Sequence, residues 1–101
     1  MEISELINQC DGFEWDKGNL EKSWIKHRVE ALEAEDIFRS HQALYFKDEK
    51  HSINEERYSA LGLTSKGREL FVSFKVRNSK IRIISARPMN ERERKIYEQH
   101  I

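Results

Sequence analysis

In residues 69–77, which read ELFVSFKVR, every second side chain is apolar, and the intervening ones are polar except for Phe71. Successive side chains of a strand point to opposite faces of a sheet, so this alternation predicts a strand with one apolar face. That face would carry Leu70, Val72, Phe74 and Val76. A turn at Asn78-Ser79 leads into a second expected strand over residues 80–86, which Pro88 stops because proline lacks the N–H that a strand ladder uses.

Two further strands are expected before this pair. A strand-like alternation of side chains begins at Leu44-Tyr45-Phe46. A charged loop follows, and residues 57–64 then alternate in the same way. Ser65-Lys66-Gly67 supplies turn residues between that strand and the next. The sequence therefore predicts an antiparallel meander of three or four strands.

Helical spacing predicts the elements of the first half. Phe13-Glu14-Trp15-Asp16 alternates as a short strand would, and a helix is expected from about Lys17 to His27. A second helix should follow, because apolar residues recur there at three- and four-residue steps. These residues are Ala31, Ala34, Ile37 and Phe38. Residues 1–12 are expected to form a short helix or an extension.

A closing helix is expected from Asn90 to about Gln99. The Asn90 side chain can accept from the open amides of a first turn, and Glu93 follows at capping-box spacing. The order strand, two helices, meander and helix predicts a single α+β domain over residues 1–101, with its helices on one side of the sheet.

The composition excludes several classes of protein. The 101 residues suit one core, and the ten aromatic residues argue against disorder although 36% of the chain is charged. The single cysteine, Cys10, excludes an intramolecular disulfide and a cysteine-rich metal site. No apolar run approaches the roughly 20 residues of a membrane span, and the acidic start Met1-Glu2 lacks the basic region of a signal peptide. We therefore expect a cytoplasmic protein that makes no membrane contact.

The charges are divided unevenly although the net charge is zero. Residues 1–50 hold seven Lys and Arg against twelve Asp and Glu, whereas residues 51–101 hold eleven against six. A basic half can attract phosphate, and an acidic half can repel it or attract a basic partner protein. A solvated surface with internal salt bridges explains the same division.

Five short segments, in this order and spacing over residues 13–98, carry a family resemblance. They are Phe13-Glu14-Trp15-Asp16, Asn19 with Lys26-His27, His51-Ser52 with Glu55-Glu56-Arg57, the block Arg82-Ile83-Ile84-Ser85-Ala86-Arg87, and Glu91-Arg92-Glu93-Arg94 with Tyr97. Together they resemble the BrnT family of ribonuclease toxins. The resemblance implies a RelE-like fold and RNA cleavage that halts growth. It also implies neutralisation by a ribbon-helix-helix antitoxin of the BrnA kind that represses the shared operon. The toxin would then contact DNA only indirectly, through its complex with the antitoxin.

The chain departs from the family pattern at two places. Family members usually follow Lys-His with glycine, where a helix can end in the left-handed conformation, but this chain has Arg28. That conformation costs arginine about 1 kcal/mol more than glycine, which leaves open a differently shaped helix end. Family members also often place Asp-Pro after the second helix, where this chain has Ser40-His41.

Three arginines are candidates for contacts with RNA phosphate. Cleavage without a metal turns the 2′-hydroxyl onto the neighbouring phosphate, which requires a base, an acid and positive donors. Arginine donates two parallel bonds to phosphate oxygens, and Arg57 and Arg87 are the expected catalytic arginines, with Arg82 as a phosphate ligand. For each of them, the alternative is a structural salt bridge.

Strand alternation separates two of these arginines. In a regular strand, Arg82 would share a face with Ile84, whereas Arg87 would lie on the face of Ile83. Because Pro88 ends the strand and can free Arg87, we expect Arg87 to be the better phosphate ligand. Arg82 is then expected to pair with Glu55 or Glu56.

His27 is the expected acid or base, because an unperturbed imidazole titrates near pH 6.5. Lys26 beside it would be a second cation for RNA. Trp24 lies one turn away, and its ring can stack on a base or fill the core. The alternative for His27 is an interaction with the carbonyls at the helix end. His51 is a weaker candidate in a polar loop.

The last helix offers Tyr97 as an RNA-binding residue. The basic residues around it are interspersed with glutamates, which is also typical of a solvated helix face. No His-x-x-x-His or comparable spacing indicates a metal, and no glycine-rich phosphate loop is present, so no metal and no cofactor are expected.

Three functions remain open from the sequence. The first is a metal-independent RNA endonuclease that acts as the toxin of a type II toxin–antitoxin pair. The second is a binding module, either a catalytically weak or inactive relative that serves as antitoxin partner and co-repressor, or an RNA binder. The third is a structural interaction domain, which would leave the late arginines paired in ion bridges with no open basic cleft.

Overall fold

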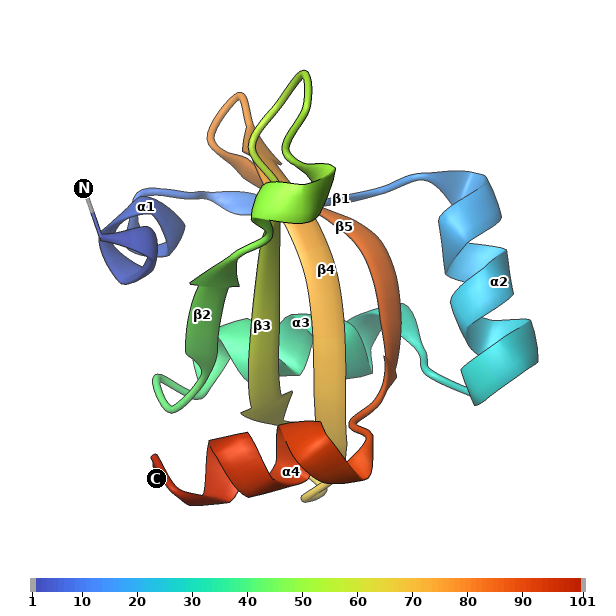
Figure 1. Cartoon of the computed structure of the whole chain (residues 1–101). Helices are drawn as coiled ribbons and strands as arrows, with labels where there is room; N and C mark the ends of the chain where they lie inside the picture. Colours follow the sequence, from blue (N-terminus) through green and yellow to red (C-terminus); the bar gives the residue numbers. More distant parts are fainter. Residues whose placement is uncertain (1, 101) are drawn as a thin grey trace.

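The computed structural model describes residues 2–100, so residues 1 and 101, the ends of the predicted domain, lie outside the described residues. A five-stranded sheet has the order β1-β5-β4-β3-β2 (Figure 1). The strands are β1 (Gly12–Trp15), β2 (Leu44–Lys47), β3 (Tyr58–Leu63), β4 (Glu69–Arg77) and β5 (Lys80–Pro88). The helices are α1 (Ile3–Asn8), α2 (Lys17–His27), α3 (Ala31–Arg39), the short 3₁₀ helix η1 (Glu49–His51) and α4 (Glu91–Glu98).

The α+β class and the antiparallel meander predicted from the sequence are confirmed. Strands β2 to β5 pair antiparallel in chain order, and two residues with positive φ, Asn78 and Ser79, make the tight turn between β4 and β5. The sheet is larger than the predicted three or four strands, because β1 adds a fifth strand, parallel to β5. The short helix predicted near the N-terminus is α1.

The helices lie on both faces of the sheet, so the prediction that they share one side is wrong. In Figure 1, α3 lies behind the strands and α4 crosses in front of their lower end. The face toward α3 contains the main core, which includes Phe74 and Ile83 with Ile37 of α3. On the opposite face, Tyr97 of α4 packs with Leu61 of β3 and Met89. We call these the α3 face and the α4 face.

A β-bulge in β5 changes which side chains share a face. Ser73 pairs with Ser85 and the next residue, Phe74, pairs with Ile83, so Ile84 is an extra residue without a partner on β4. Beyond the bulge the alternation shifts by one position, and Ala86 becomes the buried residue.

Arg82 and Arg87 consequently lie on the same face, the α4 face, and the predicted separation of the two arginines is wrong. Lys75, the register partner of Arg82, and Phe71, the partner of Arg87, both alternate with core residues of β4. Regular alternation would have turned Arg87 toward the core. The extra residue at Ile84 prevents this.

Helix α2 occupies the edge of β5 that β1 leaves open. The last residue of β1, Trp15, pairs with Ile83, so the rest of β5 has no neighbouring strand on that side. There the buried Ser23 of α2 accepts a hydrogen bond from the Ala86 N–H through its Oγ at 3.3 Å. Asp16 caps the N-terminus of α2 by accepting from the Gly18 N–H at 2.9 Å.

The C-terminus of α2 ends in the left-handed conformation despite the missing glycine. Arg28 has φ 53° and ψ 39°, and its guanidinium lies 5.1 Å from the centre of the Trp24 ring. Arg68 donates to the carbonyl oxygens of His27 and Arg28 at 2.7 and 2.8 Å, which satisfies two helix-end acceptors. The helix end therefore has the shape that a glycine would favour, with side-chain contacts that compensate for the strain.

We expect Arg28→Gly to raise the free energy of unfolding by about 0.5–1 kcal/mol. Glycine relieves a left-handed strain of about 1–2 kcal/mol, and the loss of an exposed cation–π contact offsets part of it. Urea denaturation would measure the change. Arg28→Ala is the control, because it loses the cation–π contact and keeps the strain, so it should be less stable than the wild type. A glycine variant no more stable than the alanine variant would contradict the prediction.

Candidate functional site

A pocket of about 190 Å³ lies between α2 and the second half of β5. It is far larger than the roughly 10–15 Å³ that one water needs. Its lining residues come from these two elements only: Asn19, Lys22, Ser23, Lys26, His27, Ile84, Ser85, Ala86 and Arg87. The pocket exists because β1 stops at Trp15 and α2 replaces it along the edge of β5.

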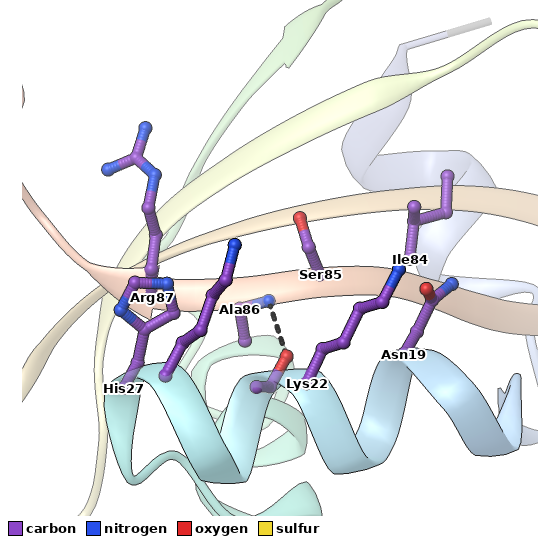
Figure 2. A pocket seen from close by; sticks show the side chains of 9 residues that line it. Asn19, Lys22, His27, Ile84, Ser85, Ala86 and Arg87 are labelled. Atoms are coloured by element: carbon purple, nitrogen blue, oxygen red, sulfur yellow. Dashed lines mark hydrogen bonds between the residues drawn. The ribbon is translucent and has the colours of Figure 1, made fainter.

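Helix periodicity presents the α2 residues to the pocket. Asn19, Lys22 and Lys26 recur at steps of three and four, so they lie on the same side of the helix. Both lysines are exposed, and neither lies within 4.0 Å of a carboxylate in the part of the chain that the structure describes. Figure 2 shows Asn19 and Lys22 rising from α2 toward the part of β5 that carries Ile84. The pocket therefore carries two lysine charges that form no ion pair with any residue between 2 and 100.

His27 lies at the end of α2 and lines the same pocket. It is half-buried, and its ring makes no hydrogen bond or ion pair to any residue between 2 and 100. The predicted alternative, in which the ring interacts with helix-end carbonyls, is not what the structure shows, because Arg68 takes the carbonyls of His27 and Arg28. His27, from the end of α2, and Arg87, from β5, line this pocket together.

Arg87 connects the pocket to the α4 face. It lines the pocket, while its guanidinium points away from α2 (Figure 2). The guanidinium forms a bidentate ion pair with Glu93, with Nη1–Oε1 at 2.7 Å and Nη2–Oε2 at 2.9 Å. It also lies 4.1 Å from the centre of the Phe71 ring. Arg87 is therefore held in one orientation.

Glu93 is fixed as an anion by its surroundings. Burial raises the pKa of its carboxyl, but the hydrogen bonds from Arg87 and from the backbone of Asn90 outweigh this and hold the pKa below its usual value. The Asn90 bond belongs to the capping box of α4, which the sequence predicted and the structure confirms.

Arg82 forms ion pairs, as expected, but with other partners than predicted. Its guanidinium lies 3.3 Å from Glu14 and 3.8 Å from Asp16. The prediction of Glu55 or Glu56 is wrong because β1 pairs with β5 in the register that sets Glu14 opposite Arg82. No local sequence signal marks that long-range parallel pairing.

Glu55 instead pairs with two cations of β4. Its carboxylate accepts from Arg77 at 2.6 Å and from Lys75 at 3.2 Å. The hydrogen bonds from Arg77 and then Lys75 lower the pKa of Glu55 to about 2, from a usual 4.5. The pairing neutralises much of the basic charge at this end of the α4 face.

We expect the folded state to lose stability as the pH falls from about 4.5 to about 2, in part through Glu55. Its pKa is lowered by folding, so its contribution is present above the unfolded pKa and is lost as the carboxylate becomes protonated. Glu55→Gln should therefore show a smaller drop in Tm between pH 5 and pH 2.5 than the wild type. Glu98→Gln, at an exposed residue without an ion pair among residues 2–100, should match the wild type. Equal drops for all three proteins would contradict the prediction.

Arg57 does not join the pocket. Its backbone is tied to the loop after β2, where its N–H donates to Ser52 Oγ and its carbonyl accepts from the Asp48 N–H. Its side chain has no ion pair within residues 2–100, and its Nε is buried without a hydrogen-bond partner. The Cα atoms of Arg57 and Arg87 are two strands and about four residues apart, or ~16 Å by strand geometry, and only Arg87 lines the pocket.

Trp24 and Tyr97 also lie away from the pocket. Trp24 is 43% exposed under Arg28 and does not line the pocket. Tyr97 is fully buried between α4 and the sheet, so it offers no surface for RNA contact. The sequence suggested such a contact because Tyr97 follows basic residues. The helix turns that residue inward to cover Leu61.

Sequence reasoning missed two residues that shape the site. Lys22 stands one turn before Lys26, and this spacing alone could have placed it on the same side of α2. Arg68 fixes the end of α2 from a turn 41 positions later, and no sequence signal points to that contact. Within residues 2–100 there is no group of three or more potential metal ligands, and no helix is long and apolar enough to span a membrane.

Comparisons with known proteins give a family and a fold. The model of a family described as the ribonuclease toxin BrnT of type II toxin–antitoxin systems matches residues 15–93. The 1.1 Å crystal structure of the Brucella abortus ribonuclease toxin BrnT is similar, with a TM-score of 0.61 and 20% sequence identity. The similarity covers 79% of this chain and 97% of that chain. No curated protein shows a significant sequence match.

Proposed function

Because this chain belongs to the BrnT family of ribonuclease toxins of type II toxin–antitoxin systems, we propose that it cleaves RNA at the pocket between α2 and β5 without a metal ion. The observation that carries the proposal is the distribution of paired and unpaired cations. Lys75, Arg77, Arg82 and Arg87 of the sheet are all engaged by carboxylates, whereas Lys22 and Lys26 at the pocket are not. Unpaired cations around a pocket attract a polyanion.

The residues around the pocket supply the groups that cleavage by the 2′-hydroxyl requires. The oxygen of that hydroxyl attacks phosphorus, its proton leaves, and the bond from phosphorus to the 5′-oxygen breaks as that oxygen takes up a proton. The half-buried His27, whose ring nitrogens bind no other residue in the described chain, can perform one of these proton transfers. Arg87, Lys22 and Lys26 stabilise the charge that develops on the phosphate oxygens.

The other predicted RNA contacts fall into two groups. Arg57 lies on the α4 face two strands away from β5 and outside the pocket, so it contacts a different part of the RNA strand. The exposed ring of Trp24 is available for stacking on a base. Arg82 supports the β1–β5 pairing through its ion pairs, and Tyr97 anchors α4.

Salt dependence tests the role of the two lysines. We expect Lys22→Ala and Lys26→Ala each to reduce the slope of log Kd against log salt concentration by about one, because each removes one phosphate contact. RNA binding would be measured by fluorescence anisotropy with a labelled single-stranded RNA. Lys17→Ala is the matched control, since it removes the same charge from α2 outside the pocket. A pocket lysine whose replacement leaves the slope at the wild-type value would contradict the assignment.

Metal independence is tested by cleavage in excess EDTA. The expected result is an unchanged rate for the purified protein, and a rate that vanishes in EDTA and returns with Mg²⁺ would overturn this part of the proposal. Binding with no cleavage under any condition would favour the alternative, an inactive relative that acts as antitoxin partner or RNA-binding module.

For the protein partner, we propose a ribbon-helix-helix antitoxin that binds DNA for the complex. A type II system implies a protein antitoxin, and the resemblance over residues 13–98 supports this class of antitoxin and action in the cytoplasm. Co-expression with the neighbouring reading frame tests it. The expected result is a stable complex that binds operator DNA, whereas a toxin that binds the same DNA alone would contradict it.

A further inference from the structure

The guanidinium of Arg87 is restrained on three sides. The Glu93 carboxylate accepts hydrogen bonds from Nη1 and Nη2 at the end of the guanidinium. The carbonyl of Pro88 accepts a further hydrogen bond from Nη1 at 3.2 Å. The Phe71 ring covers one face at 4.1 Å. These contacts leave the planar group little freedom to rotate, although the Arg87 side chain is 34% exposed.

Two N–H donors of the Arg87 guanidinium have no acceptor among residues 2–100. Arginine has five N–H groups in a fixed arrangement, and Glu93 and Pro88 together accept three of them. The remaining two are the N–H of Nε and the second N–H of Nη2, which point from the same edge. No residue between 2 and 100 accepts a bond from Nε of Arg87. Two parallel N–H groups on one edge are the donor pair that binds two oxygens of a phosphate.

Glu93 is itself fixed by the start of α4. Its Oε1 accepts from the Asn90 N–H at 2.9 Å, its N–H donates to Asn90 Oδ1 at 2.8 Å, and its side chain is only 16% exposed. Helix α4 is in turn anchored by the fully buried Tyr97. A continuous set of contacts thus runs from the core through α4 to the Arg87 guanidinium.

We propose that Glu93 and Phe71 are positioning residues, which hold Arg87 so that its Nε–Nη2 edge faces an RNA phosphate. The inference rests on the proposed function, in which Arg87 contacts that phosphate. An arginine oriented in advance loses little freedom when the transition state forms, so its donors act at full strength there. If Glu93 blocked Arg87, its carboxylate would bind the Nε–Nη2 edge and compete with phosphate, but here Glu93 leaves that edge free.

A double-mutant cycle tests the proposal with an RNA that the wild type cleaves. Single-turnover rates at saturating protein and the Kd for RNA are measured for the wild type, Arg87→Ala, Glu93→Gln and the double variant. Glutamine keeps the acceptor for the Asn90 N–H but loses the charge and one acceptor for Arg87. We expect Glu93→Gln to lower the rate roughly 10- to 100-fold with the Kd within about threefold, and to have no further effect in the Arg87→Ala background.

Three outcomes overturn the proposal in distinguishable ways. A Glu93→Gln variant that cleaves at the wild-type rate shows that Glu93 does not position Arg87. A variant that cleaves faster than the wild type shows that Glu93 hinders Arg87. Equal losses with and without Arg87 show that Glu93 acts elsewhere. An Arg87→Ala variant that cleaves at the wild-type rate shows that Arg87 does not take part in cleavage. In that case the role that the proposed function gives to Arg87 is also wrong.

Two further variants separate positioning from folding and charge. Glu91→Gln makes the same charge change in the same turn of α4, where Glu91 pairs only with exposed Lys95, and it should cleave at the wild-type rate. A loss equal to that of Glu93→Gln would overturn the proposal. If Glu93→Gln does not fold, Phe71→Leu removes the ring beneath Arg87 while keeping an apolar side chain, and a tenfold lower rate at unchanged Kd is expected. A wild-type rate for Phe71→Leu would then overturn it.

Discussion

Replacing Arg87 with alanine is expected to lower the single-turnover rate of RNA cleavage by about 10²–10³-fold. The loss corresponds to removing one preorganised donor group from the charge that develops on the phosphate. The variant should also be less stable by about 1 kcal/mol, because it leaves Glu93 without its bidentate partner. The thermal melt will therefore shift by several degrees, and rates must be compared well below both transitions.

Arg77→Ala is the matched control for this experiment. It removes an arginine from the same face of the sheet, together with an ion pair to Glu55, but at the β4–β5 turn rather than at the pocket. We expect cleavage to stay within about threefold of the wild type. If Arg77→Ala lost as much activity as Arg87→Ala, a general loss of basic charge would explain both results and the specific role of Arg87 would be refuted.

Replacing Phe74 with alanine is expected to lower the free energy of unfolding by about 3–5 kcal/mol. Phe74 is fully buried at the centre of the α3 face, and three aromatic rings surround it. The ring centres lie 5.0 Å away for Phe38, 5.6 Å for Tyr58 and 6.1 Å for Tyr45. Domains of this size are stable by only about 5–15 kcal/mol, so the variant will be marginally folded.

Urea denaturation followed by circular dichroism would measure this loss. Phe46→Ala is the control, because Phe46 lies in the same sheet with 43% of its surface exposed, and we expect it to cost about 1 kcal/mol or less. Similar midpoints for the two variants would show that the core does not depend on Phe74.

The residues of the proposed site were partly accessible from the sequence. Lys26 and His27 end a predicted helix, and Arg87 precedes the proline that ends a predicted strand, so all three were candidates, and the structure brings them to one pocket. Lys22 could have been added from helix spacing. Whether Arg57 or Tyr97 belongs with them depends on long-range packing, which the spacing of residues along the chain does not contain.

The role of Glu93 shows how far a local signal reaches. Its spacing from Asn90 predicts the capping box, since both residues lie in one helical turn. The same carboxylate also binds Arg87, and that contact depends on the angle at which α4 leaves β5. The angle is set by packing of Tyr97 and Met89 against Leu61, and not by any pair of neighbouring residues.

By itself, the sequence determined the α+β class, the antiparallel strands β2 to β5 and the helices that flank them, because side-chain periodicity and capping are local properties. The tertiary structure decided the parallel pairing of β1 with β5, which joins residues 68 positions apart, such as Glu14 and Arg82. It also decided the bulge at Ile84, which turns Arg87 away from the core. Such features follow from how the whole sheet buries its apolar face, and an alternating pattern read along one strand cannot reveal them.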